Sequence, residues 1–487
     1  MTSNFDPDQL KLAKGHFIDN TWLNEGVGLE VCRASDLRVA GVLPEASVEV
    51  IDRAMQSAKK ASTAWGATAP RQRAAILMRW AELIQDDAEN LARLESVVSS
   101  RPISETLVRD VSACVSTLRF YAEWADKLEG AVTTSGVDQL NLVLREPHGV
   151  VAAIVPWNFP LILSSWKFAP ALAAGNAMVL KPSELTPYSM LRVAELGAMA
   201  GLPRGVFNVV HGGAATGDAL VRHPGVDFIT FTGSGATGAR IVKAAADRHI
   251  EVSLELGGKS PQIVFSDVRD LDNVAELITR FFCRNSGQIC FAGARLVVNR
   301  RIRDALIEKI VALTRELRPG ETWKAETTLP PIISERQCSR IDSIVQAAVE
   351  HGAEVVTGAK SFRGEAHGAY FYPPTILDRV DVQSPAFLEE IFGPVLSVQT
   401  FDDEQEAIEL AAHPTFGLAA GVHTADLDKA FRIARQVNAG TVWINRYGLG
   451  DMTLPFGGFK QSGHGKDMGR QGIEKYFRLK AVSVQLN

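Results

Sequence analysis

The chain has 487 residues, of which 46% are hydrophobic and 22% are charged, and its formal net charge is −5. This length suffices for a large buried core and for about two to four domains or lobes, and the composition excludes a disordered chain. Proteins that bind nucleic acid are usually basic, so the acidic balance argues against a nucleic-acid partner.

The cysteines and the N-terminal segment indicate the compartment. Five cysteines are scattered along the chain, and their odd number does not fit a secreted disulfide framework. Segment 1–10 carries Asp6 and Asp8 and has no apolar core, so it lacks the pattern of a signal peptide. The longest apolar run, 150–155, is broken by Pro156 and is much shorter than the ~20 residues that cross a bilayer. We therefore expect a cytoplasmic protein with no membrane partner.

The hydrophobic pattern predicts an α/β protein. Helical periodicity covers three early segments: 47–65, 70–97 and 105–125. Short apolar runs, each followed by a turn and a helix, come next: 150–155, 177–180, 206–210 and 228–231. Strands that are apolar on both faces and alternate with helices are typical of a parallel sheet. The alternation returns over 262–442, with helices at 274–282 and 340–352, so we expect two α/β lobes.

Two segments fit neither lobe. Residues 130–146 have the pattern of an extended ribbon, and 480–486 has the pattern of one more exposed strand. Isolated strands of this kind leave unpaired edges, which usually find a partner. We interpret both segments as a pairing surface for another subunit.

Segment 285–290, with the sequence NSGQIC, contains the candidate nucleophile Cys290. It is a polar, glycine-containing loop after a predicted helix, whereas a structural cysteine normally lies in apolar sequence. A catalytic cysteine needs partial exposure and surroundings that lower its pKa. A lone cysteine is more often a small buried apolar residue, which is our interpretation of Cys32, Cys114 and Cys338.

Two further side chains suit the chemistry of a thiol nucleophile. Glu255 lies between two leucines in a strand-like segment, where burial raises a carboxyl pKa and fits it for general-base catalysis. The alternative is a salt bridge with Lys259 or with an arginine. Asn158, in the segment PWNFP, offers a rigid neutral donor for a developing oxyanion, and the alternative is an asparagine that stabilises a turn.

A glycine-rich turn, GSGATG at 233–238, follows the apolar run 228–231. The pattern G-x-G-x-x-G between a strand and a helix binds pyrophosphate on backbone amides, but it is a weak signal alone. No acidic residue ends a following strand about 20 positions on, as a Rossmann fingerprint requires. Lys181 and Glu184 follow an earlier strand and could hold ribose hydroxyls. Alternatively, Ser183 and Glu184 merely begin the next helix.

Seven segments together resemble the aldehyde dehydrogenase superfamily, in that family's order and spacing and over nearly the whole chain. They are PWNFP at 156–160, KPSE at 181–184, FTGS at 231–234, LELGGKSP at 254–261, GQIC at 287–290, EEIFGPV at 389–395 and PFGGFKQSG at 455–463. The stretch 448–455 is most similar to the branch of aminoaldehyde and γ-glutamyl-γ-aminobutyraldehyde dehydrogenases.

The resemblance implies NAD-dependent oxidation of an aldehyde to the carboxylic acid. Cys290 would attack the aldehyde, while Asn158 and the Cys290 backbone N–H hold the oxyanion and Lys167 lies behind that site. Loss of hydride to the nicotinamide would leave a thioester, and water activated by Glu255 would hydrolyse it. None of the ten histidines has the spacing of metal ligands, so no metal is expected.

The resemblance also implies the positions that bind the cofactor. They are Ile154, Pro156, Trp157, Lys181, Ser183, Glu184, Gly233, Ser234, Gly238, Leu256, Glu390 and Phe392. A carboxylate at Glu184 would repel the 2′-phosphate of NADP. NAD is therefore the favoured cofactor, and NADP is the alternative.

The implied architecture has two Rossmann-like α/β lobes and a β-ribbon arm. Residues 1–127 and 148–257 would form the dinucleotide-binding domain, and 258–458 the catalytic domain. Residues 128–147 and 470–487 would form an oligomerisation arm that assembles a homodimer or homotetramer.

The substrate would be a small-molecule aldehyde. Its candidate binding residues are Phe159, Trp166, Arg284, Phe291, Gly450, Asp451 and Phe456. Gly450 stands where many relatives have an aromatic residue, which would widen the tunnel. Arg284 and Asp451 together would suit an extended aldehyde with a zwitterionic head, such as a γ-glutamylamino-aldehyde of polyamine breakdown. One alternative is that these two side chains pair with each other or with neighbours. Another is that the enzyme is of succinic-semialdehyde type or of broad specificity.

Three other classes would use parts of this pattern. A cofactor-free cysteine hydrolase would need Cys290 but not Lys181, Glu184 or Glu390. A coenzyme-A-acylating relative would need no general base, and Glu255 argues against it. A non-catalytic relative would be expected to lack Cys290 or Glu255.

Overall fold

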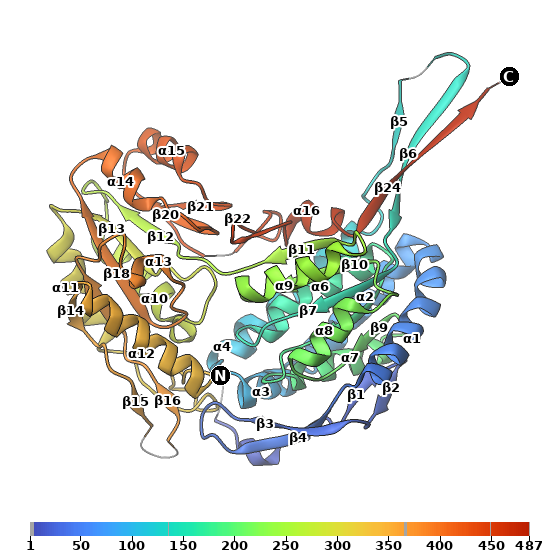
Figure 1. The fold of residues 1–487 in the computed structure, drawn as a ribbon, viewed down its shortest axis with the longest axis horizontal. Coiled ribbons are helices and arrows are strands. Elements are labelled where there is room, and N and C mark those ends of the chain that lie inside the picture. The colour runs from blue at the N-terminus through green and yellow to red at the C-terminus, as the bar shows by residue number, and fades with distance from the viewer. Residues whose placement is uncertain (1–3, 135, 365–367, 449, 487) are drawn as a thin grey trace.

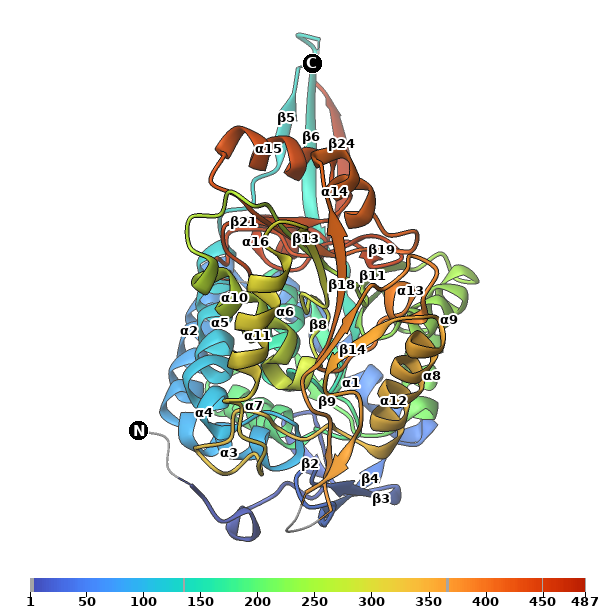
Figure 2. The same cartoon turned by 90° about the vertical axis from the view of Figure 1, so that its left-hand side faces the viewer.

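The computed structural model describes residues 4–134, 136–364, 368–448 and 450–486. Two α/β lobes lie beside each other, and a narrow β-ribbon projects away from both (Figure 1 and Figure 2). The blue-to-green part of the chain forms most of one lobe, and the yellow-to-orange part forms the other (Figure 1). None of the helices in the described ranges is both long and apolar enough to cross a membrane.

The larger sheet has, among the described residues, eight strands in the order β2-β1-β9-β8-β7-β10-β11-β23. Their bounds are β1 (His16–Ile18), β2 (Thr21–Leu23), β7 (Val150–Ile154), β8 (Ala177–Lys181), β9 (Phe207–Val209), β10 (Phe228–Thr232), β11 (Glu251–Glu255) and β23 (Gly463–His464). From β9 to β11 the strands are parallel, whereas the edge strands pair antiparallel. Every residue of β7 and β8 is buried, as expected for parallel strands covered on both faces.

The two faces of this sheet pack against different helices, because side chains alternate along each strand. Val151 and Ala153 face the core shared with α2, α3, α5, α6 and α7, whereas Val150 and Ala152 face α1, α8 and α9. These helices are α1 (Val48–Ala67), α2 (Pro70–Asp86), α3 (Ala88–Val98), α5 (Ser112–Trp124), α6 (Pro160–Ala173), α7 (Tyr188–Met199), α8 (Ala214–Arg222) and α9 (Gly235–Ala246).

The second sheet has the strand order β14-β17-β18-β13-β12-β20-β21 and is parallel except where β14 joins β17. Its strands are β12 (Pro261–Val264), β13 (Arg295–Asn299), β14 (Glu354–Thr357), β17 (Thr375–Asp378), β18 (Val395–Phe401), β20 (Ala419–His423) and β21 (Thr441–Ile444). Helices α10 and α11 pack on one face, and α14 and α15 on the other, while α12 and α13 cover the end of the sheet near β17. They span α10 (Leu271–Cys283), α11 (Arg303–Thr314), α12 (Glu335–Glu350), α13 (Pro385–Leu388), α14 (Glu404–Ala411) and α15 (Leu427–Gln436).

The projecting ribbon joins the two segments that the sequence left outside the lobes. It consists of β5 (Ala131–Thr133), β6 (Gln139–Pro147) and β24 (Phe477–Gln485), all antiparallel. The register of β24 on β6 runs from Phe477↔Pro147 to Gln485↔Gln139. The two predicted strands thus pair with each other within one chain, and apolar side chains such as Val132 and Leu479 remain exposed.

Shorter elements complete the chain. They are η1 (Pro7–Gln9), β3 (Val27–Cys32), β4 (Val39–Glu45), α4 (Ile103–Glu105), η2 (Thr106–Val111), η3 (Arg284–Gly287), β15 (Phe362–Arg363), β16 (Tyr370–Phe371), β19 (Phe416–Gly417), β22 (Phe459–Lys460) and α16 (Gly469–Glu474).

Two predicted helices differ from the observed ones. The helix expected over 70–97 is divided into α2 and α3 at Asp87, whose ψ of 14° leaves the helical range. The helix expected over 105–125 begins as α4, continues as the π-helical turn η2, and becomes α5 at Ser112. Hydrophobic periodicity misses both features because a one-residue interruption or a single π turn barely changes the apolar spacing.

Candidate active site

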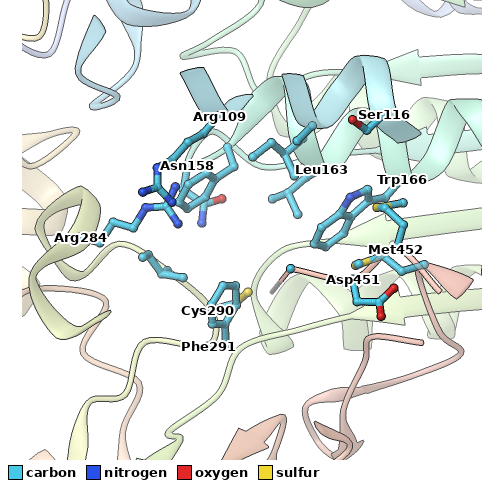
Figure 3. A pocket seen from close by; sticks show the side chains of 16 residues that line it. Arg109, Ser116, Asn158, Leu163, Trp166, Arg284, Cys290, Phe291, Asp451 and Met452 are labelled. Carbon is cyan, nitrogen blue, oxygen red and sulfur yellow. The ribbon is translucent and has the colours of Figure 1, made fainter. Parts of the chain in front are cut away.

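Two pockets meet at Cys290. The α5 pocket, about 320 Å³, is lined by η2, α5 and α6, by the loop around Cys290, and by residues 450–452 and 468. The α9 pocket, about 600 Å³, is lined by residues 156–158, by 232–236 at the start of α9, by 255–257 and by 388–390. Cys290, Asn158 and Leu163 line both. Figure 3 looks into the α5 pocket and shows Cys290 and Asn158 among its lining side chains.

The turn before Cys290 has an unusual backbone. Asn285 and Ser286 adopt left-handed conformations, with φ of 52° and 51°. Gly287 follows with φ of 70°, and a Cβ on it would lie 2.1 Å from the Gly393 carbonyl oxygen. Non-glycine residues in this region are costly, and such strain gathers at functional sites.

Hydrogen bonds tie this turn to the segment that carries Asn158. The Asn158 side-chain amide donates to the Gln288 carbonyl oxygen (3.0 Å), and the Asn285 amide donates to the Asn158 carbonyl oxygen (3.1 Å). The Gln288 side chain donates in turn to the Asn285 carbonyl oxygen (2.9 Å). One N–H of the Asn158 amide remains available, since the group carries two.

The Cys290 thiol is half-buried, and its pKa lies above the usual range. Burial is the largest cause, followed by the negative charges of Glu390 and Glu255, while backbone N–H groups act in the opposite direction. The expectation that the surroundings lower this pKa is therefore wrong for this structure, because burial raises it and the two neighbouring carboxylates add to that effect.

Glu255 is the last residue of β11 and is buried. Within the described residues, neither of its carboxyl oxygens has a hydrogen-bond partner, and the same is true of the Lys259 ammonium group. Burial raises the pKa of Glu255 well above its usual value, and the charge of Asp467 adds to this. Gly457, with φ of 151°, lies so close that a Cβ there would be 2.4 Å from Glu255 Oε1. The backbone thus leaves no room for a side chain on that flank of the carboxyl group.

Lys167 belongs to a buried charge cluster behind Glu255. Its Nζ lies 2.6 Å from Asp467 Oδ2, and Lys475 Nζ lies 2.6 Å from Asp467 Oδ1. Burial acts to raise the pKa of Asp467, but the two lysines outweigh it and the pKa falls below the usual value. Lys167 lines neither pocket and reaches the site through Asp467, a residue that the sequence analysis did not single out.

Glu390 and Phe392 line the α9 pocket. Glu390 accepts a hydrogen bond from the Gly258 backbone N–H (3.0 Å), and a Cβ on Gly257 would lie 2.1 Å from its other oxygen. Burial raises the pKa of Glu390 to about 7, against the Gly258 hydrogen bond. Phe392 packs edge-on against Trp157, with ring centroids 5.4 Å apart.

The start of α9 forms the opposite wall of this pocket. Ser234 is the N-cap and accepts from the Thr237 backbone N–H (3.4 Å), while Gly233 and Ser234 line the pocket with Pro156, Trp157 and Leu256. The first N–H groups of a helix have no partner within the helix and attract anions. Gly238 permits close packing, since a Cβ there would lie 2.9 Å from the Leu256 side chain.

Ile154, Lys181, Ser183 and Glu184 lie outside the lining of both pockets. Ile154 is the last residue of β7, which pairs with β10, and Lys181 is the last residue of β8, which pairs with β7; Ser183 and Glu184 follow β8. Lys181 Nζ donates to the Gly212 carbonyl oxygen (2.8 Å) and lies 3.8 Å from the partly exposed Glu184 carboxylate. Ligands of open α/β sheets bind along these strand ends.

Six of the seven predicted substrate-binding residues line the α5 pocket: Phe159, Trp166, Arg284, Phe291, Gly450 and Asp451. Phe456 does not, and instead packs behind Trp166 and Phe291, with centroids 5.7 Å from each.

The sequence analysis missed the other lining residues: Arg109, Ala113, Ser116, Ile162, Leu163, Ile289, Met452 and Met468. The spacing of 109, 113 and 116 places three of them on one helix face, which was a readable signal.

Arg284 and Asp451 pair with neighbours, which was the alternative interpretation. Arg284 Nε donates to Glu105 Oε2 (2.9 Å), and Arg101 bonds to the same oxygen (2.7 Å). Asp451 Oδ1 accepts from the Thr453 backbone N–H (2.9 Å) and hydroxyl (2.6 Å), and these bonds lower its pKa. In the described ranges, no group of three or more His, Cys, Asp or Glu side chains is placed to hold a metal ion.

Comparisons with known proteins show the family of this chain. Residues 22–482 match the Aldehyde dehydrogenase family. The chain is 41% identical over 440 residues to the NADP/NAD-dependent aldehyde dehydrogenase PuuC of Escherichia coli (strain K12), covering 90% of this chain and 88% of that protein.

Two solved structures are also similar to this chain over nearly its whole length. The γ-glutamyl-γ-aminobutyraldehyde dehydrogenase of Burkholderia cenocepacia J2315 has a TM-score of 0.96 and 40% identity, covering 99% of this chain and 98% of that one. An indole-3-acetaldehyde dehydrogenase in complex with NAD+ has the same TM-score, identity and coverage.

The chain therefore belongs to the aldehyde dehydrogenase family, a family of NAD(P)-dependent oxidoreductases. Its fold is the α/β fold of that family, and the family expected from the seven sequence motifs is confirmed.

Proposed function

We propose that this enzyme oxidises an aldehyde to a carboxylic acid, with NAD as cofactor and Cys290 as nucleophile. The observation that carries the proposal is that Cys290 and Asn158 line both pockets. A thiol and an amide donor at this junction can contact a substrate carbonyl in the α5 pocket and a hydride acceptor in the α9 pocket at once.

The α9 pocket suits a dinucleotide. Its volume is about 600 Å³, and the start of α9 presents backbone N–H groups for a pyrophosphate. Glu390 offers a half-buried carboxylate that can accept from ribose hydroxyls, and Lys181 with Glu184 lies at the end of β8 for the adenosine half. The NADP/NAD-dependent relative and the NAD+-bound neighbour support this assignment. The bound cofactor supplies the hydride acceptor.

The residues of this chain then divide the reaction among them. Cys290 reacts as the thiolate after its proton passes to water: Sγ forms a bond to the carbonyl carbon and the carbonyl π electrons move to the oxygen. Asn158 donates its free N–H to that oxygen as negative charge develops. An oxyanion-hole donor of this kind contributes roughly 10²–10³ in rate. After hydride loss a thioester remains on Cys290.

Glu255 completes the reaction as the general base. Its two unpartnered oxygens can take a proton from water as that water attacks the thioester carbon. Burial raises the pKa of Glu255 above its usual value, which makes the carboxylate a stronger base than a free glutamate. Lys167 and Lys475 act through Asp467 on the charge around it.

We further propose that the substrate is an extended amino- or γ-glutamylamino-aldehyde of polyamine breakdown. The support is the likeness to the γ-glutamyl-γ-aminobutyraldehyde dehydrogenase and the open α5 pocket beside Gly450. An enzyme of succinic-semialdehyde type or of broad specificity is the alternative.

The domain assignment and the assembly are also proposals. The eight-stranded sheet of the described chain, with residues 1–127 and 148–257, would bind the dinucleotide, and 258–458 would carry the nucleophile. The ribbon of β5, β6 and β24 exposes apolar side chains and an unpaired edge, which supports a homodimer or homotetramer. Free cysteines throughout support a cytoplasmic location.

A substrate panel tests the proposal. NADH formation is followed with γ-glutamyl-γ-aminobutyraldehyde, succinic semialdehyde and a simple alkanal, for the wild type and for Cys290→Ser. We expect oxidation by the wild type, preference for the first substrate, and no turnover by the variant. Equal efficiency on all three would refute charged recognition. Turnover by Cys290→Ser, or thioester hydrolysis without any NAD binding, would refute the dehydrogenase assignment.

A further inference from the structure

Arg109 is a charged side chain in the α5 pocket that the mechanism does not use. It lies in the π-helical turn η2 and is exposed at the pocket lining (Figure 3). Within the described residues its guanidinium makes no hydrogen bond and no ion pair. Single π turns inside helices are rare and occur often at functional sites.

The other two charged residues of this pocket are already engaged. Arg284 donates to Glu105 and lies over the Phe159 ring at 5.7 Å, and the Asp451 carboxylate accepts two hydrogen bonds from Thr453. In Figure 3 the two arginines lie on one side of the pocket and Asp451 on the other. Arg109 is therefore the charge with its full bonding capacity available to a ligand.

The rest of the lining suits a hydrocarbon chain. Phe159, Ile162, Leu163, Trp166 and Met452 contribute apolar surface between the junction at Cys290 and the pocket mouth. Ala113, four residues after Arg109, lines the same pocket and carries only a small side chain.

We propose that Arg109 determines substrate specificity by binding a carboxylate at the end of the aldehyde that is distal from the carbonyl. The inference deepens the proposed function and rests on it. A guanidinium presents a planar fork of donors that matches a carboxylate in two parallel hydrogen bonds. Arg109 thus selects carboxylate-bearing aldehydes, and it disfavours aldehydes whose only charge is an ammonium group.

Matched aldehydes of two lengths test this inference. The carboxylates 5-oxopentanoate and 8-oxooctanoate are compared with hexanal and nonanal, which replace the carboxylate by an ethyl group. For Arg109→Gln we expect KM for the better carboxylate substrate to rise about tenfold with kcat nearly unchanged, because a charge-assisted hydrogen-bonded pair is lost. KM for the alkanals should stay the same.

Arg119→Gln is the matched control. Arg119 is an exposed arginine of α5 that bonds to Gln85 and lies outside the pocket lining. It should leave all four substrates unaffected. Equal losses on carboxylate and alkanal in Arg109→Gln would indicate a structural role and overturn the proposal. So would an unchanged carboxylate KM, or a wild type that prefers the alkanals at both lengths.

Two further measurements complete the test. The first uses the wild type and so does not depend on the folding of a variant, and the second measures binding and so does not depend on turnover. In the wild type, raising the salt from about 0.05 M to about 0.5 M should raise KM for the carboxylates but not for the alkanals, because an exposed ion pair is screened. Calorimetric titration with glutarate and with pentanoate then measures binding without turnover. Weaker glutarate binding by Arg109→Gln with no oxidation of any aldehyde would uphold the anion site and refute the proposed function. Oxidation with no Arg109-dependent preference would refute the anion site alone.

Discussion

The two pockets that meet at Cys290 are built in different ways. The α9 pocket is formed where parallel strands end and a helix begins, from the segments 156–158, 232–236 and 255–257 together with 388–390. The α5 pocket is formed by side chains on the faces of η2, α5 and α6 and by the loop 450–452. The first depends on backbone N–H groups and glycines, and the second on which side chain each helix position carries.

This difference suggests separate roles for the two pockets: the α9 pocket and the junction at Cys290 serve the chemistry, and the α5 pocket recognises the aldehyde. Close backbone approaches at Gly257 and Gly457 tolerate almost no substitution, because a Cβ at either would lie within 2.4 Å of a carboxyl oxygen. Nothing comparable constrains Arg109 or Ala113, whose side chains face a cavity. We therefore expect substitutions in the α9 pocket and at the junction to change cofactor use or chemistry, and substitutions in the α5 pocket to change the choice of aldehyde.

The largest expected effect is at the junction. Glu255→Gln should reduce steady-state turnover by roughly 10²–10⁴, the usual contribution of general acid–base catalysis, because the thioester is no longer hydrolysed. Acylation should persist, so a burst of NADH equivalent to the enzyme concentration should precede the slow phase. Rapid mixing with aldehyde and NAD measures both phases.

Glu409→Gln, an exposed glutamate of α14, is a matched control and should behave as wild type. If Glu255→Gln abolishes the burst together with turnover, then Glu255 acts before hydride transfer, and its assignment to thioester hydrolysis is wrong.

A smaller effect is expected on the cofactor side, at Glu184. Its partly exposed carboxylate lies 3.8 Å from Lys181 Nζ at the end of β8. Glu184→Ser removes the negative charge that repels a 2′-phosphate, so kcat/KM for NADP relative to NAD should rise roughly tenfold. KM for the aldehyde should not change.

If Glu184→Ser altered the choice of aldehyde instead of the choice between NAD and NADP, the proposed division of roles between the two pockets would be wrong. Glu195→Ser, which removes a partly exposed partner of Arg192 on α7, controls for a general change in surface charge.

Two residues of the charge cluster behind Glu255, Asp467 and Lys475, should shift the pH dependence of thioester hydrolysis in opposite directions when they are replaced. Glu255 acts as a base only when deprotonated, so thioester hydrolysis should rise with pH through its pKa. The Asp467 carboxylate raises that pKa and Lys475 lowers it. Lys475→Met should therefore move the rising limb of the pH–rate profile to higher pH, and Asp467→Asn should move it to lower pH.

At a pH on the rising limb of the wild type, the two variants should differ from wild type by roughly threefold to tenfold in opposite directions, as measured by single-turnover hydrolysis of the acyl-enzyme. Lys480→Met, which removes an ion pair with Glu146 in the ribbon, should leave the limb in place. Limbs that move in the same direction would show that Asp467 and Lys475 act through packing rather than through charge.

Much of the fold could be predicted from the sequence. The apolar runs at 150–155 and 228–231 correspond to β7 and β10, because a strand buried on both faces needs an unbroken apolar sequence. The division at Asp87 and the π turn η2 were not predictable, since both leave the hydrophobic spacing almost unchanged.

The candidate site was likewise only partly predictable from the sequence. Motifs singled out Cys290, Asn158 and Glu255, which all line the α9 pocket, because the glycines and strand ends beside them leave a local pattern. Asp467 left no such pattern, because it gains its environment from residues far away in sequence such as Lys167. Arg109 left only its spacing from Ala113 and Ser116 on one helix face. The prediction that the Cys290 pKa is lowered was wrong for a related reason. Burial raises this pKa, and the carboxylates of Glu390 and Glu255 that add to it come from distant segments.

The smallest expected effect concerns Glu95, which bonds to the start of helix α6 near the junction at Cys290. Glu95 of α3 is buried and accepts from the Leu161 backbone N–H (3.0 Å), at the start of the helix that follows Asn158, and from the Ser189 hydroxyl (2.5 Å). Burial, followed by the charge of Asp110, raises the pKa of Glu95 to about 8. An unfolded glutamate titrates near 4.3, at about its reference pKa.

The stability that this raised pKa provides is present in full below about pH 4 and is lost as the pH rises through about 8, because the folded protein must then hold a buried carboxylate. Glu95→Gln remains neutral, so its apparent Tm should fall less than that of the wild type between pH 6 and pH 9, by about 1–3 °C. Glu89→Gln, an exposed residue of the same helix, should give a curve parallel to the wild type. Parallel curves for Glu95→Gln as well would show that Glu95 keeps an ordinary pKa, and that helix α6 is held at the junction by packing alone.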